Sequence, residues 1–565
     1  MSSATGGEAL ALQLRHEGVR DVFGIPGVQL DAATDGLWQV RDDVRFVTAR
    51  NEQSVTHMAD GYARISGRPG VALVVPGPGA LNALTGLATA YACGSPVLLI
   101  AAQIPSHAIG AGHGLLHELP DQTGLLRRLT AWSALADRPE AVAPLLAEAF
   151  ARLRARPARP VALEVPQDVL DARGQIELVD PVAPDAPPAP DPVDLAVAAE
   201  VLRSARTPLI WAGGGAIGAA TEVRRLAERL QAPVVMSTGG LGVLPSRHPL
   251  AMTPLHARAF VRHVDAVLVV GSRFIDRRAM PRFPAPDARF VYLNTDPVAF
   301  GPPRRPGVAL HADAAVGLRA LLAECDVAGG RPSRAAEVAA VRDWAGTQLR
   351  HIEPQLGWVS ALRAALAPDA VLVTDLTQVG YVLPLAYPVS RPGELITPGY
   401  QGTLGYALPT AIGAALARPG SRVVVLSGDG GLGYALAELG TLARLNADVT
   451  VVVMADGRFG NVHRAQRQRF GRSLGTRLAN PDFVRLADAF GVPAVRVRDP
   501  EGLSAALRES AATPGPALIE VPVGEMPHPW HLLIDAVAPP VPVAPSPLDG
   551  PTAPGVDNAT ARPAQ

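Results

Sequence analysis

The stretch LSGDGGLGY (426–434) places one carboxylate, that of Asp429, among four glycines directly after an apolar run. Glycines allow backbone N–H groups to approach a ligand closely, and the residues that follow have helical period, so a phosphate could bind at that helix's N-terminus. A phosphate alone would be repelled by Asp429. A divalent cation removes this conflict, because Mg²⁺ prefers oxygen ligands and commonly joins one or two carboxylates to phosphates.

A second carboxylate fits the same ion. Asp456 follows the apolar run VTVVVMA (449–455) and lies 27 residues after Asp429, about the length of one helix and one strand. The carboxyl ends of neighbouring parallel strands form the edge at which open α/β sheets bind ligands. Either aspartate alone is equally well a turn residue. Together they predict a magnesium–phosphate site.

The elements that would position these residues are those of parallel α/β domains. Short β-branched runs alternate with longer Ala/Leu/Arg-rich stretches of helical period, in three blocks. We therefore predict an α/β fold with three doubly wound parallel-sheet domains. The expected buried strands are 44–48, 71–75, 96–101 and 161–165; 208–215, 234–236, 266–274 and 290–294; and 370–375, 423–430, 449–456 and 517–522.

Composition shifts set the predicted domain boundaries. The domains are expected at 1–175, 195–328 and 345–536. A proline-rich linker at 176–194 should be stiff and extended. The tail 537–565 is rich in proline and alanine and too poor in bulky apolar residues to pack, so we predict disorder there.

Bulk composition limits the partners. The chain has 565 residues, with 51 Lys+Arg against 52 Asp+Glu, so its charge gives no support for binding nucleic acid or an acidic membrane. Two cysteines argue against a disulfide framework and a cysteine-built zinc site. No apolar run reaches about 18 residues and no signal-peptide pattern is present. We expect a cytoplasmic protein with a small-molecule partner, no nucleic acid and no membrane.

Several further stretches share one resemblance. The GDG stretch with its polar cluster 27 residues later resembles thiamine diphosphate (ThDP) enzymes, and the chain is similar to their acetolactate synthase-like family of 2-oxo acid decarboxylases and carboligases over about residues 5–535. The other matching stretches are VFGIPGVQL (22–30), RNEQSVTHMADGYARISG (50–67), PGPGALNALTGLATA (76–90) and YQGTLGYALPTAIGAALARPG (400–420). The three domains would then be the pyrimidine-binding, central and diphosphate-binding domains.

The resemblance implies a ThDP site with Mg²⁺ bound by Asp429, Asp456 and the backbone oxygen of Arg458. Glu52 would activate the cofactor through its aminopyrimidine, and Leu404 would support the bent cofactor. Without the family, Glu52 reads as a partner of a helix dipole. The other implied cofactor-binding residues are Pro26, Gly27, Thr377, Gln378, Gly402, Gly428, Gly430, Gly431, Phe459, Gly460 and Asn461. For Thr377 and Gln378 ordinary strand-to-helix capping is the alternative.

The chain departs from the family near the expected substrate. Leu116-His117-Glu118 stand where typical acetolactate synthases carry Phe-Gln-Glu. His117 is therefore predicted as a catalytic residue that transfers protons at neutral pH. A structural histidine with one backbone hydrogen bond is the alternative.

The segment 457–466 also departs. Asn461-Val462 and Ala465 replace the usual Met-Val and Trp, which predicts a more open and polar pocket. His463 and Arg464 either meet a substrate carboxylate or line solvent. In the central block, the stretch after His248-Pro249 is shorter than in FAD-binding relatives, so we predict that FAD is not required.

The predicted function is a ThDP- and Mg²⁺-dependent lyase or carboligase that decarboxylates a 2-oxo acid to an enamine and passes it to a proton or a carbonyl acceptor. The alternatives are a simple 2-oxo acid decarboxylase, a flavin-assisted oxidase of the pyruvate oxidase type, and a non-catalytic cofactor-binding relic in a larger assembly. In the family the site lies between domains of two chains, so we expect it at a dimer interface, in a homotetramer.

Overall fold

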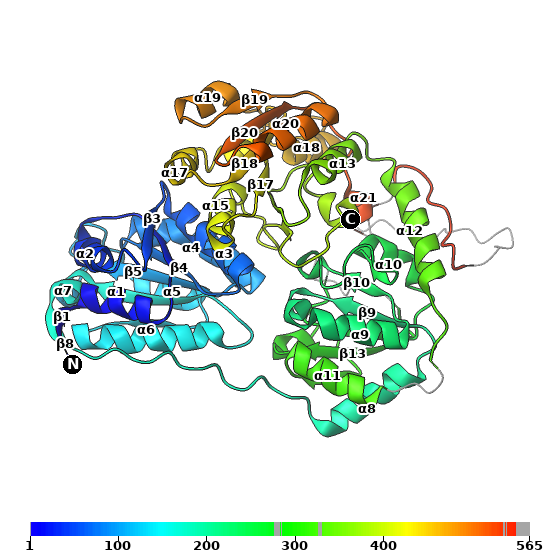
Figure 1. Ribbon diagram of the computed structural model, residues 1–565, viewed down its shortest axis with the longest axis horizontal. Coiled ribbons are helices and arrows are strands. Elements are labelled where there is room, and N and C mark those ends of the chain that lie inside the picture. The colour runs from blue at the N-terminus through cyan, green and yellow to red at the C-terminus, as the bar shows by residue number, and fades with distance from the viewer. Residues whose placement is uncertain are drawn as a thin grey trace.

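The computed structural model describes residues 2–275, 283, 285–325, 330–534, 537 and 539–549. It contains three six-stranded sheets whose strand pairs are all parallel, each flanked by helices. Figure 1 shows the N-terminal domain in blue and cyan beside the C-terminal domain in yellow and orange, with the central domain in green. The predicted three-domain α/β fold is confirmed.

The N-terminal sheet has the strand order β3-β2-β4-β5-β7-β6. Its strands are β2 (Asp21–Gly24), β3 (Arg45–Thr48), β4 (Gly70–Val74), β5 (Val97–Gln103), β6 (Ser133–Leu135) and β7 (Val161–Pro166). Its helices are α1 (Gly6–His16), α2 (Asp31–Gln39), α3 (Glu52–Ser66), α4 (Pro78–Cys93), α5 (Gln122–Leu129), α6 (Pro139–Arg154) and α7 (Gln167–Asp171). The first and last strands of this domain, β1 (Ser2–Thr5) and β8 (Arg173–Ile176), pair as an antiparallel ribbon.

The central sheet has the order β11-β10-β9-β12-β13-β14. Its elements are α8 (Pro192–Ser204), β9 (Pro208–Ala212), α9 (Ala220–Leu230), β10 (Val234–Met236), β11 (Ala251–Met252), α10 (Pro254–Phe260), β12 (Ala266–Val270), β13 (Arg289–Asn294), β14 (Val308–His311) and α11 (Ala314–Glu324). Residues 177–191, before α8, form neither helix nor strand. Figure 1 shows this segment running extended between the first two domains.

The C-terminal sheet has the order β16-β15-β17-β18-β20-β19. Its strands are β15 (Val371–Thr374), β16 (Leu395–Ile396), β17 (Val423–Gly428), β18 (Val449–Ala455), β19 (Ala494–Arg496) and β20 (Ala517–Pro522). Its helices are α12 (Ala335–Leu349), α13 (Gln355–Ala365), α14 (Leu383–Ala386), α15 (Ala407–Ala417), α16 (Asp429–Leu432), α17 (Glu438–Leu445), α18 (Gly460–Phe470), α19 (Phe483–Ala489), α20 (Pro500–Ala512) and α21 (Trp530–Leu533).

The first and last domains pack through α3 and α15. A Cβ added at Gly61 or at Gly413 would collide with the backbone of the opposite helix, so glycine permits this close approach. A buried polar contact joins the same helices, because the Tyr406 hydroxyl donates to an Asp60 carboxylate oxygen at 3.0 Å. The Arg64 guanidinium lies 3.6 Å from the same carboxylate and balances its charge. The two helices therefore fix the N-terminal domain against the C-terminal one.

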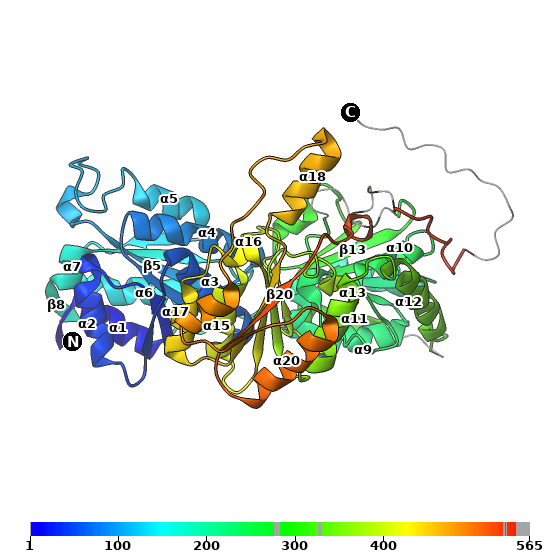
Figure 2. The same ribbon diagram turned by 90° about the horizontal axis from the view of Figure 1, so that it is seen from above.

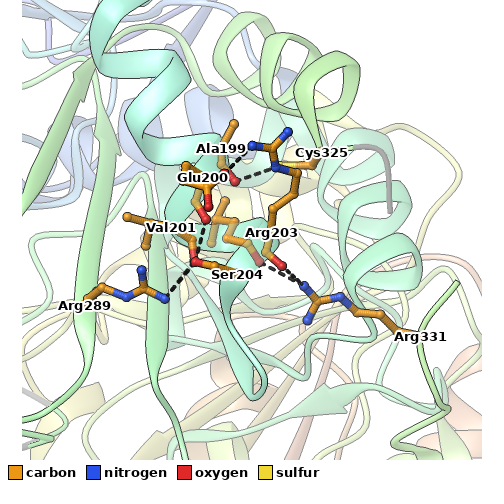
Figure 3. Close-up of polar contacts among 9 residues, drawn as sticks. Ala199, Glu200, Val201, Arg203, Ser204, Arg289, Cys325 and Arg331 are labelled. Carbon is orange, nitrogen blue, oxygen red and sulfur yellow. Dashed lines mark hydrogen bonds and ion pairs between the residues drawn. The ribbon is translucent and has the colours of Figure 1, made fainter. Parts of the chain in front are cut away.

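Two arginines cap the C-terminal end of α8 (Figure 3). Arg331 donates to the carbonyl oxygens of Leu202 at 3.1 Å and Arg203 at 2.8 Å, and Arg289 donates to the Ser204 hydroxyl at 3.1 Å. Cations at this end satisfy free carbonyl groups and complement the helix dipole. Arg331 follows the central domain in sequence, so this cap holds the chain to that domain as it leaves it.

The first part of the tail contacts the rest of the chain. Ala544 accepts a hydrogen bond from the Trp344 indole at 2.8 Å, and the Ser546 hydroxyl donates to Ala259 O at 3.0 Å. Residues 539–549 of the tail that was predicted to be disordered are mostly exposed but make these contacts, and residues 550–565 lie outside the described residues. Within the described parts of the chain, none of the helices combines the length and apolar character needed to cross a membrane.

Candidate cofactor and substrate site

The two predicted metal-binding aspartates lie at neighbouring strand ends. β17 and β18 pair in parallel with Gly428 opposite Met454, so Asp429 and Asp456 leave the same edge of the sheet. Asp429 accepts hydrogen bonds from the backbone N–H of Gly457 at 2.7 Å and from the Asn480 amide at 2.5 Å. These donors hold the Asp429 carboxylate toward the end of β18.

The electrostatics of the pair suit a cation. Burial, together with the negative charge of Asp429, raises the pKa of Asp456 to about 6. Two carboxylates in this arrangement repel each other, and a divalent cation between them would remove that cost. Within the described residues no group of three or more His, Cys, Asp or Glu side chains could hold a metal ion, so protein ligation would combine these two carboxylates with amide or backbone oxygens.

The glycines at this edge are partly or fully buried and pack closely against neighbouring side chains. A Cβ at Gly430 would lie 2.9 Å from the Phe459 ring, and one at Gly431 would lie 2.9 Å from an Asp375 oxygen. Gly457 has φ +71°, a conformation that favours glycine. Glycine backbone beside two carboxylates is a set of N–H and oxygen groups that suits a magnesium-bound diphosphate.

A buried carboxylate, Asp375, supports the same edge from β15. It accepts hydrogen bonds from the Ser427 hydroxyl at 2.5 Å and from Ala407 N at 3.0 Å, and burial raises its pKa to about 6. Nearby, the Thr377 hydroxyl accepts from Gly380 N at 2.8 Å within the turn after β15, whereas α14 begins after Val382 without a side-chain cap. Asp375 thus links β15, β17 and α15 next to the glycines at 428–431.

Gln378 and Asn461 face each other across the same site. The Gln378 amide donates to Asn461 Oδ1 at 2.6 Å. Asn461 lies in the first turn of α18, behind Phe459 and Gly460. The turn after β15 and the start of α18, which both carry predicted cofactor-binding residues, therefore share one polar contact.

Glu52 is the first residue of α3. Asn51 caps this helix by accepting from Gln53 N at 2.8 Å, and the Glu52 carboxylate accepts from the Asn82 amide at 3.0 Å. The Gln53 amide donates to the carbonyl oxygen of Leu404 at 3.0 Å. The start of α3 therefore meets both α4 and the loop carrying Gly402 and Leu404.

His117 lies beside the loop that leads into α4. Its Nδ1 is 3.2 Å from Oε1 of Gln29, a buried residue that follows Pro26-Gly27, so its partner is a side chain rather than the expected backbone group. His117 has φ +66°, and a Cβ at Gly77 would collide with its carbonyl oxygen. A Cβ at Gly79 would lie 3.6 Å from Glu52 Oε1. The loop 76–79 thus lies against both predicted catalytic residues.

His463 and Arg464 are both largely buried. Each is 9% exposed. His463 Nδ1 is 2.9 Å from the Thr476 hydroxyl and 3.0 Å from the Ser473 hydroxyl. His463 therefore has local partners, whereas Arg464 faces the pocket discussed below.

Sequence reasoning missed several residues of this region. Asn480 contacts the Asp429 carboxylate from a loop, and Asn82 contacts the Glu52 carboxylate from α4. The Gln122 amide, which accepts from Gly77 N at 2.9 Å and donates to buried Glu164 at 3.0 Å, fixes the loop before α4. Only Asn480, followed by a proline, carried a turn signal.

The glycines of the central domain pack on each other. Gly215 N donates to Gly271 O at 3.0 Å, and a Cβ at Gly213 or Gly215 would collide with the backbone at Gly271. These glycines therefore serve a close turn-to-turn contact between β9 and β12. The prediction about FAD stays a prediction.

Comparison with known families matches all three domains. The N-terminal and C-terminal TPP (thiamine pyrophosphate) binding domains of thiamine pyrophosphate enzymes match residues 4–125 and 375–521, and the central domain of the same enzymes matches residues 195–321. The fold, the aspartate pair and these matches define a ThDP-dependent enzyme.

Relatives place it within that class. The chain is 35% identical to a probable 2-ketoarginine decarboxylase from Pseudomonas aeruginosa, covering 92% of this chain and 94% of the relative. It is 30% identical to the acetolactate synthase isozyme 1 large subunit of Escherichia coli over 92% and 93% of the two chains, and 32% identical to an acetolactate synthase of Arthrospira platensis over 92% and 94%. The chain belongs to the acetolactate synthase-like family of ThDP-dependent enzymes.

Proposed function

We propose that this enzyme binds ThDP with Mg²⁺, removes CO₂ from a 2-oxo acid, and delivers the remaining acyl unit either to a proton or to a second carbonyl compound. The single observation that carries the proposal is the pair Asp429 and Asp456 at adjacent strand ends, beside the glycines that follow β17 and β18. Two carboxylates together with nearby backbone groups suit a magnesium-bound diphosphate better than they suit a purely structural role.

Each residue has a defined task in this proposal. When bound, ThDP supplies the nucleophilic carbon and the electron sink for decarboxylation. Asp429, Asp456 and the Arg458 carbonyl hold the cation, while Asn480 fixes the Asp429 carboxylate. Thr377, Gln378 and the Gly428–Gly431 and Phe459–Asn461 backbones bind the diphosphate, and Pro26, Gly27, Gly402 and Leu404 contact the rings.

Glu52 holds the proton that its carboxyl shares with the cofactor's pyrimidine ring. The hydrogen bond from Asn82 to one carboxylate oxygen fixes its orientation and leaves the other oxygen free for that contact. His117, oriented by buried Gln29, delivers or removes protons at the substrate.

After decarboxylation the same site could either protonate the acyl unit or transfer it to a carbonyl compound. The named relatives include a decarboxylase and acetolactate synthases. Asn461 and Ala465 stand in place of larger apolar residues. They favour a 2-oxo acid with a polar side chain over the substrates of an acetolactate synthase. We favour decarboxylation with a protonated product, with carboligation as the alternative.

We further propose a homotetramer in the cytoplasm, with each site completed at a dimer interface, and no FAD requirement. The designation of relatives as large subunits supports assembly into larger complexes. A colourless purified protein without flavin absorbance is expected, and bound flavin would favour an oxidase instead.

The test is a screen of 2-oxo acids, alone and with aldehyde acceptors, that follows CO₂ release and products together. The proposal expects CO₂ release dependent on ThDP and Mg²⁺. No release from any 2-oxo acid by protein that binds both would contradict it.

A further inference from the structure

A cavity of about 530 Å³ opens between α18 and the segment after β20. Its lining includes Arg464 and Arg467 of α18, and Glu525 and His528 of that segment. We call it the α18 pocket. Figure 2 shows α18 projecting from the body of the C-terminal domain.

Arg464 connects this pocket to the proposed cofactor site. Its guanidinium lies 3.4 Å from both Gln378 Oε1 and Asn461 Oδ1, and it donates to Met526 O at 2.7 Å. These three acceptors are neutral. The nearest carboxylate, that of Glu525, lies 3.8 Å away and its side chain is 65% exposed.

The pocket therefore carries excess positive charge. Two arginines face one glutamate, and burial together with the charge of Arg464 lowers the pKa of His528, which keeps that ring neutral at pH 7. The helix adds to this charge, because α18 contains three arginines and no acidic residue, while Asp456, four residues before it, also interacts electrostatically with Arg464. Such a site attracts an anion.

The reacting carboxylate of a 2-oxo acid is a poor candidate for that anion. Its charge leaves the carboxyl group as CO₂ forms, so a strong ion pair would stabilise the substrate more than the transition state and slow the reaction. A carboxylate that keeps its charge throughout is bound equally in both states and gains affinity at no cost in rate.

We propose that Arg464 binds the distal carboxylate of an acidic 2-oxo acid, so that the donor substrate is a 2-oxo dicarboxylate. This inference rests on the proposed function and names the substrate class of the same site. A substrate with a cationic side chain, as the name of the 2-ketoarginine decarboxylase relative implies for that protein, would face the Arg464 charge here.

The experiment compares 2-oxoglutarate, its neutral counterpart 2-oxopentanoate and cationic 2-ketoarginine as substrates of the enzyme loaded with ThDP and Mg²⁺. The variant is Arg464→Gln. Arg464→Lys keeps the charge, and exposed Arg469→Gln on the same helix is the matched control. Because a charge-assisted hydrogen bond is lost, Arg464→Gln should raise KM for 2-oxoglutarate by roughly 10- to 100-fold with little change in kcat.

The same variant should change KM for 2-oxopentanoate far less than KM for 2-oxoglutarate, and Arg464→Lys should recover part of the loss on 2-oxoglutarate. Equal losses on both substrates would place Arg464 at the reacting carboxylate or the cofactor and overturn the inference. A preference for 2-ketoarginine would overturn it as well.

A binding measurement separates this inference from the proposed function. Calorimetry should detect glutarate, but not pentanoate, binding to wild-type protein, and Arg464→Gln should abolish that binding. Glutarate binding without turnover of any 2-oxo acid would contradict the proposed function alone. Turnover without a preference for 2-oxoglutarate over 2-oxopentanoate would contradict only the inference that Arg464 binds a distal carboxylate.

Discussion

Replacing Asp456 by asparagine should stabilise the metal-free protein and abolish the Mg²⁺-dependent binding of ThDP. Burial and the charge of Asp429 raise the pKa of Asp456 from 3.8 to about 6. An acid whose pKa rises on folding lowers the free energy of unfolding as the pH increases from its pKa in the unfolded chain to its pKa in the folded protein. For Asp456 this range is about pH 4 to 6, and the full loss of stability persists at higher pH.

The size of the effect follows from that pKa difference. It corresponds to about 3 kcal/mol at neutral pH for a fully buried group. Because Asp456 is partly exposed, solvent screening reduces this to about 1–2 kcal/mol. For a domain of this size, Asp456→Asn should raise the melting temperature by about 2–6 °C.

The assay is thermal unfolding at pH 7.5 in EDTA without ThDP, repeated at pH 4. The gain should be present at pH 7.5 and lost at pH 4, where the wild-type carboxyl group is largely protonated. Exposed Asp488→Asn is the matched control and should change little. With Mg²⁺ and ThDP the order should reverse, because only the wild type gains stability from binding. An unchanged or lower melting temperature in EDTA would refute the repulsion between the two aspartates.

The remaining predictions concern the cofactor's two ends. Glu52→Gln should leave ThDP bound, by calorimetry, while reducing kcat by roughly 10²- to 10⁴-fold, and a near-normal rate would remove Glu52 from its role. Asn82→Ala should lower kcat about 10-fold and shift its pH profile, since the Glu52 carboxylate loses its orienting donor; an unchanged profile would argue against that contact. Gly430→Ala should weaken ThDP binding at least 10-fold, because its Cβ would press on the Phe459 ring. Gly433→Ala is the control and should bind ThDP normally, because its nearest neighbour would be 3.4 Å away. Equal ThDP affinities of the two variants would contradict the role of the glycines after β17 in cofactor binding.

The buried strands were predictable because each carries its own pattern. The apolar runs at 423–430 and 449–456 form β17 and β18 within two residues of the expected bounds. The missed strands are mostly edge strands of two to four residues, such as β11, β16 and β19, whose pairing depends on a neighbour rather than on their own composition. β2 was missed although fully buried, because only two of its four residues, Val22 and Phe23, are apolar.

The site divides in the same way. Asp429 and Asp456 could be paired because their strands are adjacent in the sheet and close in sequence. Asn480 and Asn82 could not, because their contacts with the carboxylates depend on how loops and helices fold back over the sheet. Burial of Arg464 was equally invisible, since Met526 reaches it from a segment 62 residues away.

The most direct test of the central claim is calorimetric titration of ThDP into metal-free protein with and without Mg²⁺, for the wild type and for Asp429→Ala. The account predicts tight binding by the wild type only when Mg²⁺ is present, and its loss in Asp429→Ala. Equal affinity of the two proteins, or binding by the wild type that is indifferent to Mg²⁺, would contradict it.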